Sequence, residues 1–434
     1  MTDWMGDTFT SDVGWNHLER LVDIGNRMAG SPGEREALEA TRDALEAVGA
    51  RDARIDPFDI QGWERGNSVL YTGETTQDCI ALPRSPDASV EGELVDLGYG
   101  LPENFEETEV SGKMVLVSSS VPDYYHRGVH RREKYYYAVE NGAAGFVFAN
   151  NAAGGLPITG SVGTADAPIG DIPAVGVSKE VGDRLTRRFE GETVAIEVDC
   201  ETPDATSGNV HAELGPDTDD ELLVTGHVDA HDICEGATDN GTGTATVVEL
   251  ARTLATREDE LETKVHFVCF GAEEVGLVGS GHESAQTDRE RIKAVVNVDC
   301  TVRGRTLKFD THGFDALEDA AETVADRLGH PVSTNPNLVP HSDHWPFVQW
   351  GVPGYMVSAE KETTGRGWAH TAADTLDKLE KRTFREQAIL LTELVVELAG
   401  EDVQTTHTSP EAVASTLEDE DLAEGMKVTG DWPY

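Results

Sequence analysis

The sequence has few basic residues for its length. Its 434 residues include 81 Asp and Glu but only 34 Lys and Arg, of which ten are Lys, so the formal net charge is −47. Binding to nucleic-acid phosphates draws on clustered Lys and Arg, so we exclude nucleic acid as a partner. An acidic surface spread over a whole chain is typical of a salt-loaded cytoplasm, where ions screen self-repulsion. We therefore expect a halophilic protein.

Long hydrophobic runs and cysteine motifs are also missing. No segment approaches the roughly 18 consecutive apolar residues of a membrane-spanning helix, and the first residues carry no basic or apolar leader, so we expect neither a membrane contact nor secretion. The five cysteines are an odd number, far apart, without C-x-x-C spacing, which excludes a disulfide framework and a cysteine zinc site. These absences predict a cytoplasmic location.

The chain nevertheless carries enough apolar sequence for a large core. Apolar residues make up 38% of it and glycine occurs 44 times, which excludes a coiled coil, a fibrous protein and a disordered acidic tail. The length favours two or three domains.

The spacing of apolar residues divides the chain into two units. Residues 15–49 predict two amphipathic helices separated by a Gly-Pro turn, whereas residues 76–205 show short β-like runs and one helical stretch, and predict a β-rich insert. From residue 206 onwards, strands alternate with helices, the strands falling at 222–225, 265–270, 294–298 and 354–357 and the helices at 243–254, 315–327 and 385–398. This alternation predicts an α/β fold, a doubly wound mixed, mostly parallel sheet. The domains would be 1–75 with 206–434, and the insert 76–205, the last thirty residues forming a solvated tail or a loosely packed helix.

Residues able to bind metal follow the predicted strands of this sheet. Sites in such sheets form at the carboxyl ends of the strands. The candidates there are His227 and Asp229 after the first strand, Asp239 in the next loop, Glu273 and Glu274, then Asp299, and finally His370. His, Asp and Glu without Cys are ligands for zinc or a similar divalent ion in an open catalytic site.

A charge count favours two ions. Asp239, Glu274 and Asp299 with two neutral histidines would leave two Zn²⁺ with one positive charge, which a hydroxide would balance, and a shared carboxylate is typical of two-metal hydrolases. Asp229 would hold the second nitrogen of the His227 ring. Of the pair Glu273-Glu274, one carboxylate can ligate metal while the other takes a proton. His231, Asp232 and Cys234 lie in the same loop and are further candidate ligands.

Five motifs carry a family resemblance as well. They are G-H-V-D (226–229), A-T-D-N-G-T-G (237–243), F-G-A-E-E-V-G-L-V-G-S (270–280), N-V-D (297–299) and H-T-A-A-D-T (370–375), preceded by R-M-A-G-S-P-G-E-R-E (27–36). This series resembles the co-catalytic dizinc aminopeptidases and glutamate carboxypeptidases of peptidase clan MH, that is, the zinc exopeptidase fold. Within residues 76–205, the segments at 111–117, 142–151 and 171–177 are similar to a protease-associated domain.

The resemblance implies a role for each residue. His227 and Asp299 would hold one zinc, Glu274 and His370 the other, Asp239 would bridge them, and Glu273 would be the general base, with a cis peptide between Asp239 and Asn240. Co²⁺ or Mn²⁺ could replace zinc in such a ligand set. The chain departs from many relatives at Ala369, where they have a Tyr before the last histidine; Tyr355 and His344 are candidate replacements.

The sequence thus predicts an exopeptidase that hydrolyses peptides through a dizinc-bridged hydroxide, most simply an aminopeptidase. A carboxypeptidase is the alternative, since Arg303, Arg305 and Arg366 lie close in sequence to Asp299 and His370 and could hold a terminal carboxylate. A glutaminyl-cyclase-like transferase, a one-zinc relative, and a non-catalytic binding module fit less well because the ligand set is complete. The side-chain specificity and the oligomeric state leave no local sequence signature.

Overall fold

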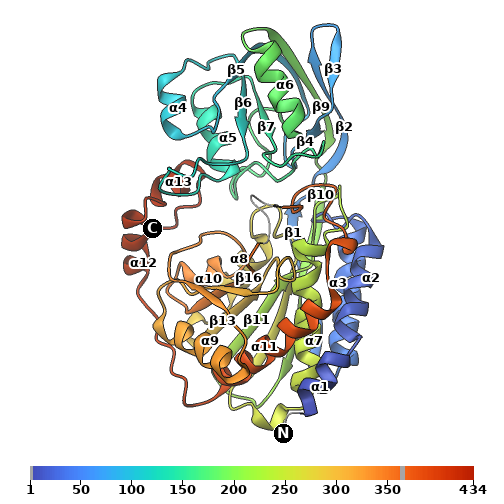
Figure 1. Ribbon diagram of the computed structural model, residues 1–434, viewed down its shortest axis with the longest axis vertical. Helices are drawn as coiled ribbons and strands as arrows, with labels where there is room; N and C mark the ends of the chain where they lie inside the picture. The colour runs from blue at the N-terminus through green and yellow to red at the C-terminus, as the bar shows by residue number, and fades with distance from the viewer. Residues whose placement is uncertain (1–2, 362–366) are drawn as a thin grey trace.

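The computed structural model describes residues 3–361 and 367–434. These residues form two units stacked along the longest axis, each built on an eight-stranded sheet (Figure 1). We refer to them as the larger unit and the insert.

The sheet of the larger unit is mixed, as the sequence predicted. Its order is β1 (Arg51–Gln61), β10 (Asp204–Leu214), β12 (Lys264–Phe270), β11 (Glu221–His227), β13 (Ile292–Val298), β16 (Gly354–Ala359), β14 (Leu307–Asp310) and β15 (Ser333–Asn335). The central strands β12, β11, β13 and β16 run parallel, whereas β10 pairs antiparallel with both β1 and β12, and β14 with β16. The carboxyl ends of the four central strands therefore meet at one edge.

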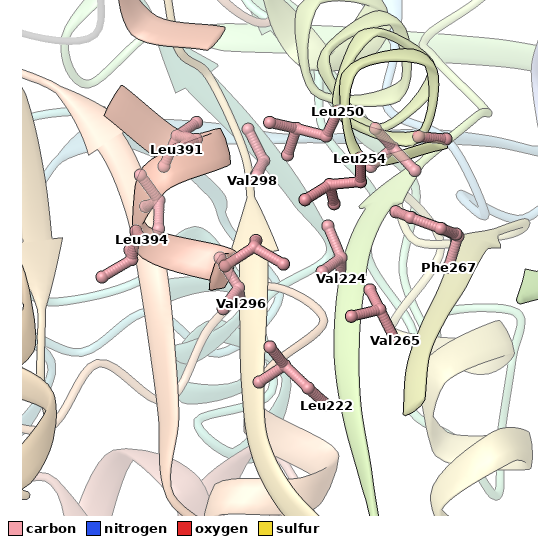
Figure 2. Close-up of a cluster of buried hydrophobic side chains, with 14 of the residues drawn as sticks. Leu222, Val224, Leu250, Leu254, Val265, Phe267, Val296, Val298, Leu391 and Leu394 are labelled. Carbon is pink, nitrogen blue, oxygen red and sulfur yellow. The ribbon is translucent and has the colours of Figure 1, made fainter. Parts of the chain in front are cut away.

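Helices cover both faces of this sheet. One face carries α1 (Asp3–Thr10), α2 (Val13–Ile24), α3 (Pro32–Ala47), α7 (Thr242–Ala255), α9 (Asp315–Leu328) and α11 (Lys381–Ala399), and the other α8 (Val278–Gln286) and α10 (Trp345–Val348). Side chains alternate along each strand, so Leu222 and Val224 of β11 face α7 and α11 (Figure 2). Leu223 points to the other face, where it belongs to a cluster with Phe347 of α10. The sequence predicted these central strands and most of these helices, including the pair α2 and α3.

The start of α3 carries the clearest helix-start signal in the N-terminal part of the sequence. Ser31 caps this helix by accepting a hydrogen bond from the Glu34 N–H at 3.0 Å, and Pro32 occupies its first position. The Gly-Pro turn of the sequence therefore contains the start of α3, whereas α2 already ends at Ile24.

The insert forms the second sheet. Its order is β3 (Thr75–Gln77), β2 (Glu64–Thr72), β9 (Thr193–Glu201), β5 (Ala88–Asp96), β6 (Met114–Ser118), β7 (Gly145–Ala149), β8 (Ala174–Val177) and β4 (Ile80–Ala81), with helices α4 (Pro102–Glu107), α5 (Arg131–Glu140) and α6 (Lys179–Phe189). This sheet already begins at Glu64, ahead of residue 76, because β2 pairs antiparallel with β9.

The C-terminal segment does not form a solvated tail. It contains α12 (Pro410–Asp419) and α13 (Ala423–Val428), and Leu417 and Met426 are buried against Trp345 of the larger unit. Beyond α13, the Arg132 guanidinium of the insert pairs with Asp431 at 2.7 Å. Of the two alternatives predicted for this segment, the solvated tail was wrong and the helix was right: its apolar residues pack on the larger unit, and α13 lies against α5 of the insert (Figure 1).

The remaining helical turns are short. They are η1 (Ala237–Gly241), η2 (Glu258–Glu260), η3 (Arg289–Arg291) and η4 (Leu376–Lys378). Across residues 3–361 and 367–434, none of the helices combines the length and the apolar character needed to span a bilayer.

Candidate metal centre

The metal-ligand candidates meet at the carboxyl edge of the larger sheet. His227 is the last residue of β11, Asp299 directly follows β13, and Glu273 and Glu274 follow β12. Asp239 lies in η1 ahead of α7, and His370 comes from the loop after β16.

Asp239 lies between two sets of these side chains. Its Oδ1 is 3.3 Å from His227 Nε2, and its Oδ2 is 3.3 Å from His370 Nε2. His227 Nε2 is 3.9 Å from Asp299 Oδ1, while His370 Nε2 is 3.7 Å from Glu274 Oε2. The two oxygens of one carboxylate therefore face two different histidine–carboxylate pairs, and the Asp239–Asn240 peptide bond is cis.

This donor set fits two divalent cations. The ligand atoms of a tetrahedral zinc site at 2.0–2.2 Å lie about 3.3–3.6 Å apart, close to the separations found here. Among the described residues, His227 Nε2, Glu274 Oε1 and Asp299 Oδ1 are buried without a hydrogen-bond partner. Buried polar atoms are normally bonded, so these orphaned nitrogen and oxygen atoms have the character of metal ligands.

The electrostatics of the cluster also favour a cation. Burial, followed by the negative charge of Asp239, raises the pKa of Glu274 to about 7. Burial opposes ionisation of Asp239 as well, but the His227 and His370 rings hold the pKa of Asp239 well below its usual range. A dication would stabilise the ionised form of both carboxylates.

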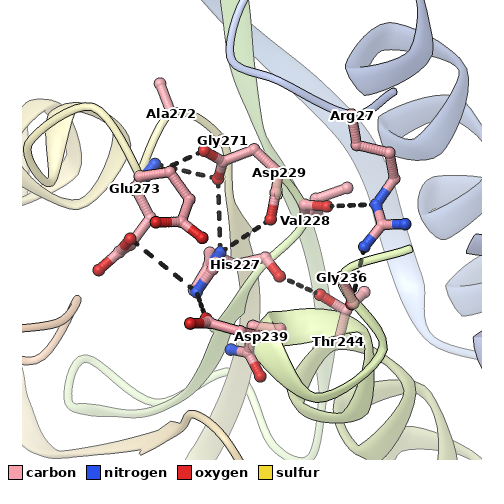
Figure 3. A network of polar contacts seen from close by, with 12 residues as sticks. Arg27, His227, Val228, Asp229, Gly236, Asp239, Thr244, Gly271, Ala272 and Glu273 are labelled. Carbon is pink, nitrogen blue, oxygen red and sulfur yellow. Dashed lines mark hydrogen bonds and ion pairs between the residues drawn. The ribbon is translucent and has the colours of Figure 1, made fainter. Parts of the chain in front are cut away.

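Asp229 joins the ligand His227 to the Glu273-Glu274 loop (Figure 3). The Asp229 backbone carbonyl is 3.0 Å from His227 Nδ1, and its Oδ1 is 3.5 Å from the same nitrogen. The Asp229 carboxylate accepts the N–H groups of Glu273 at 3.0 Å and Glu274 at 3.1 Å. The sequence placed the carboxylate on the His227 ring; in the structure, the backbone carbonyl is the nearer partner of that ring, and the carboxylate supports the loop.

Two residues of the N-terminal motif brace the same loops. Arg27 is fully buried and donates to the carbonyls of Val228 at 3.0 Å and Gly236 at 3.0 Å (Figure 3). Glu34 accepts the N–H of Ala272, directly before Glu273, at 3.0 Å. The sequence indicated only a family likeness for this motif and not its supporting contacts, because those contacts join residues more than 200 positions apart.

One of the three further candidates in the loop reaches the cluster. His231 Nε2 is 2.9 Å from Glu274 Oε2, and its ring packs edge-on against His370. Asp232 instead pairs with Arg65 at 2.7 Å, and the Cys234 thiol donates to the His231 carbonyl. His231 is therefore a candidate ligand or ligand neighbour, and the other two side chains have structural partners.

The candidate replacements for the missing Tyr were wrong. The Tyr355 hydroxyl donates to the Leu317 carbonyl inside the core, and His344 contacts the Val339 carbonyl and stacks on His312. The sequence analysis did not name Ser342, which contacts a candidate ligand: its hydroxyl donates to Asp299 Oδ2 at 2.5 Å.

The three arginines named for a carboxylate clamp have different positions. Arg305 pairs with Glu386, and 67% of its side chain is exposed. Arg303 lines the cleft, whereas Arg366 lies outside the described residues.

A cleft of about 1180 Å³ opens over the cluster. Its walls come from both units: Asp299 and His370 of the larger unit, Arg84 and Arg131 of the insert, and Trp432 of the C-terminal segment. A substrate in this cleft would therefore contact the insert as well as the candidate metal ligands.

Comparisons with known proteins identify both units. Residues 209–395 match the sequence model of Peptidase family M28, and residues 90–185 match that of the PA domain. The chain is 26% identical over 393 residues to Aminopeptidase YwaD of Bacillus subtilis, covering 86% of this chain and 81% of that protein. It is 25% identical to a probable leucine aminopeptidase 2 of Aspergillus oryzae, covering 83% of this chain and 77% of that protein.

Two solved structures share the whole fold. A Peptidase M28 precursor from Shewanella amazonensis superimposes with a TM-score of 0.78 at 22% identity, covering 93% of this chain and 97% of that one. BSAP, a zinc aminopeptidase from Bacillus subtilis, gives a TM-score of 0.71 at 24% identity, covering 91% and 96%. These two likenesses concern the fold.

Proposed function

We propose that this chain, whose residues 209–395 match peptidase family M28 and whose residues 90–185 match the PA domain, is a zinc-dependent aminopeptidase that binds two ions. The observation that carries the proposal is the position of Asp239 between the pairs His227–Asp299 and His370–Glu274. The chain matches most of the length of two relatives that are named aminopeptidases, and this supports the same activity.

In this proposal, His227 and Asp299 would hold one ion, Glu274 and His370 would hold the other, and Asp239 would serve both. The ions supply Lewis acidity, which polarises the peptide carbonyl and acidifies water. Zinc is the metal named for BSAP. Co²⁺ and Mn²⁺ suit the same nitrogen and oxygen donors.

Glu273 acts as the general base. Its carboxylate is partly open to the cleft and lies 4.0 Å from His227 Nε2. Asp299 lies at a similar 3.9 Å from that nitrogen, so the choice of Glu273 as the base follows the family resemblance. Burial raises the pKa of Glu273 well above its usual range, which favours a carboxylate that accepts a proton and returns it to the leaving amine. Asp229 fixes the position of this base through the two N–H groups it accepts.

Cleavage from the carboxyl end is the second candidate, because Arg303 lines the cleft and could hold a terminal carboxylate. The complete ligand set argues against a one-zinc transferase and against a binding module. A halophilic habit remains a prediction from the acidic composition, and the cytoplasmic location remains a separate prediction from the sequence.

The experiment that tests the proposal compares free and blocked substrates. We expect the protein to hydrolyse Leu-p-nitroanilide, to leave the N-acetylated anilide intact, and to leave an N-acetylated peptide with a free carboxyl end intact. Cleavage of the blocked peptide with none of the free anilide would replace the aminopeptidase by the carboxypeptidase.

A further inference from the structure

The cleft is enriched in positive charge relative to the chain. Outside the metal centre, it is lined by Arg84, Arg131, Arg132, Arg303 and Lys361 but by only three carboxylates, Asp59, Asp204 and Asp431. The whole chain has 34 basic and 81 acidic residues, so basic residues form a larger share of this lining than of the chain, although the four carboxylates of the metal centre also line it. Basic groups gathered in a cleft attract a negatively charged ligand.

Several of these cations have structural partners. Arg132 pairs with Asp431 at 2.7 Å, and Arg131 donates to the Ser161 carbonyl at 2.9 Å. Arg84 is buried at the junction of the two units and donates to the Val275 carbonyl at 2.5 Å. Arg84 therefore connects the insert to the loop after β12, and Arg132 connects it to the C-terminal segment, whereas the hydrogen bond between Arg131 and Ser161 lies within the insert.

Arg303 differs from them. Its Nε donates to the Ala359 carbonyl at 3.0 Å, which pins the side chain to the end of β16. Within residues 3–361 and 367–434, no carboxylate lies within ion-pair distance of its guanidinium and its two terminal nitrogens make no hydrogen bond. The Arg303 guanidinium is half-buried and held through its Nε. Its two terminal nitrogens can therefore donate hydrogen bonds to a ligand in the cleft.

Arg303 also lies beside the metal centre. It follows Asp299 by four residues, and its charge acts on the Cys300 thiol next to that ligand. Cys300 and Met356 line the same part of the cleft. Since only one residue of an aminopeptidase substrate lies on the amino side of the bond that is cut, a group this near the ligands is within reach of that residue's side chain.

We propose that Arg303 binds the side-chain carboxylate of the substrate's N-terminal residue, so that the enzyme prefers peptides beginning with Glu or Asp. The inference rests on the proposed aminopeptidase activity. The planar guanidinium, already oriented by Ala359, can offer its terminal N–H groups to both oxygens of a carboxylate, the geometry in which Arg–carboxylate pairs are strongest.

The test compares Glu-p-nitroanilide with Gln-p-nitroanilide, which have the same shape and differ in charge. In moderate salt, we expect kcat/KM to be about ten- to hundredfold higher for the Glu substrate, the usual effect of a hydrogen-bonded charge. Arg303→Gln should abolish this preference without lowering kcat/KM for the Gln substrate to the same extent, and Arg303→Lys should retain part of it.

Arg305→Gln is the matched control. It removes the same type of side chain two residues away, from an exposed position paired with Glu386, and should leave the Glu-to-Gln ratio unchanged. A second pair of substrates, Leu-Gly and Leu-Gly-amide, differs only in the charge of the C-terminus. It tests whether Arg303 binds the C-terminal carboxylate of a peptide and not the side-chain carboxylate of its N-terminal residue.

Each outcome decides the proposal. Hydrolysis of Leu-p-nitroanilide with no preference for Glu over Gln overturns the role of Arg303 while the proposed function stands. An equal loss on every substrate in Arg303→Gln, or a loss confined to Leu-Gly against its amide, also overturns it. If no anilide is cleaved, the proposed function itself fails.

Discussion

The backbone N–H of Glu273 donates to Oδ1 of Asp229 at 3.0 Å. Through its own backbone carbonyl, Asp229 also contacts the ring of His227 at 3.0 Å. One residue thus fixes the distance between a candidate metal ligand and the candidate base. The two functions that a hydrolase must keep in register, metal binding and proton transfer, are coupled by the residue two positions beyond the end of β11.

The first prediction separates the base from the ligands. Because Glu273 binds no metal in our account, Glu273→Gln should keep the metal content and the fold and lower kcat by about 10²–10⁴. Asp229→Asn is the comparison: the amide replaces one of the two oxygens that accept N–H groups, and metal affinity or activity should fall by about 10–100-fold. Metal analysis and steady-state kinetics on both variants check this, and loss of metal in Glu273→Gln would mean that Glu273 is a ligand.

The second prediction concerns the bridging carboxylate. Asp239→Asn removes one negative charge and one of the two oxygens that face His227 and His370. We expect near-total loss of activity and fewer than two zinc ions per chain by metal analysis. Asp232→Asn, in the preceding loop but paired with Arg65, should keep its metal. A fully active Asp239→Asn would remove the bridge from the mechanism.

The third prediction concerns stability in acid. Burial, with a contribution from Arg27 and Arg20, lowers the pKa of His17 to about 4, and its Nε2 lies 3.1 Å from the Thr41 hydroxyl. The unfolded chain binds a proton at His17 below about pH 6.5 and the folded protein only below about pH 4, so stability present above pH 6.5 is lost as the pH falls through this window. The loss amounts to about 3 kcal/mol.

Denaturant unfolding at several pH values checks the effect of His17. Stability should fall less between pH 7 and pH 4 in His17→Gln than in the wild type, whatever the effect of the substitution at pH 7. His126→Gln, at a side chain that is 55% exposed, serves as the control. Identical pH dependence of the wild type and His17→Gln would contradict the assignment.

The fourth prediction follows from the net charge of −47. Salt shortens the Debye length from about 10 Å at 0.1 M to about 3 Å at 1 M, which weakens the repulsion among surface carboxylates. Thermal stability and the lifetime of activity should therefore rise with KCl into the molar range. Full and lasting activity in salt-free buffer would contradict a halophilic protein.

The sequence predicted the centre of the larger unit well because its strands are buried on both faces. The run Leu222–Thr225 and the run Val265–Phe270 are mostly apolar and buried, and the polar residues that follow them mark the edge of the sheet. Local pattern and tertiary environment agree at these strands, so the positions of His227 and Glu274 could be inferred.

The sequence was less informative where partners come from distant parts of the chain. The edge strand β1 reads R-D-A-R-I-D-P-F-D-I-Q, in which alternate residues are charged, and only its pairing with β10 identifies it as part of the larger sheet. Likewise, the contact of Glu34 with Ala272 and that of Arg132 with Asp431 join residues hundreds of positions apart. No local spacing records such contacts, so the support of the base and the docking of the C-terminal segment required the structure.

The most direct test of the account is the rate of Leu-p-nitroanilide hydrolysis as zinc is returned to the chelator-treated protein. The account predicts no hydrolysis without metal, a rise as zinc is added, and a plateau near two zinc ions per chain. Full activity in the chelated protein, or a plateau at one zinc ion, would contradict a two-metal aminopeptidase.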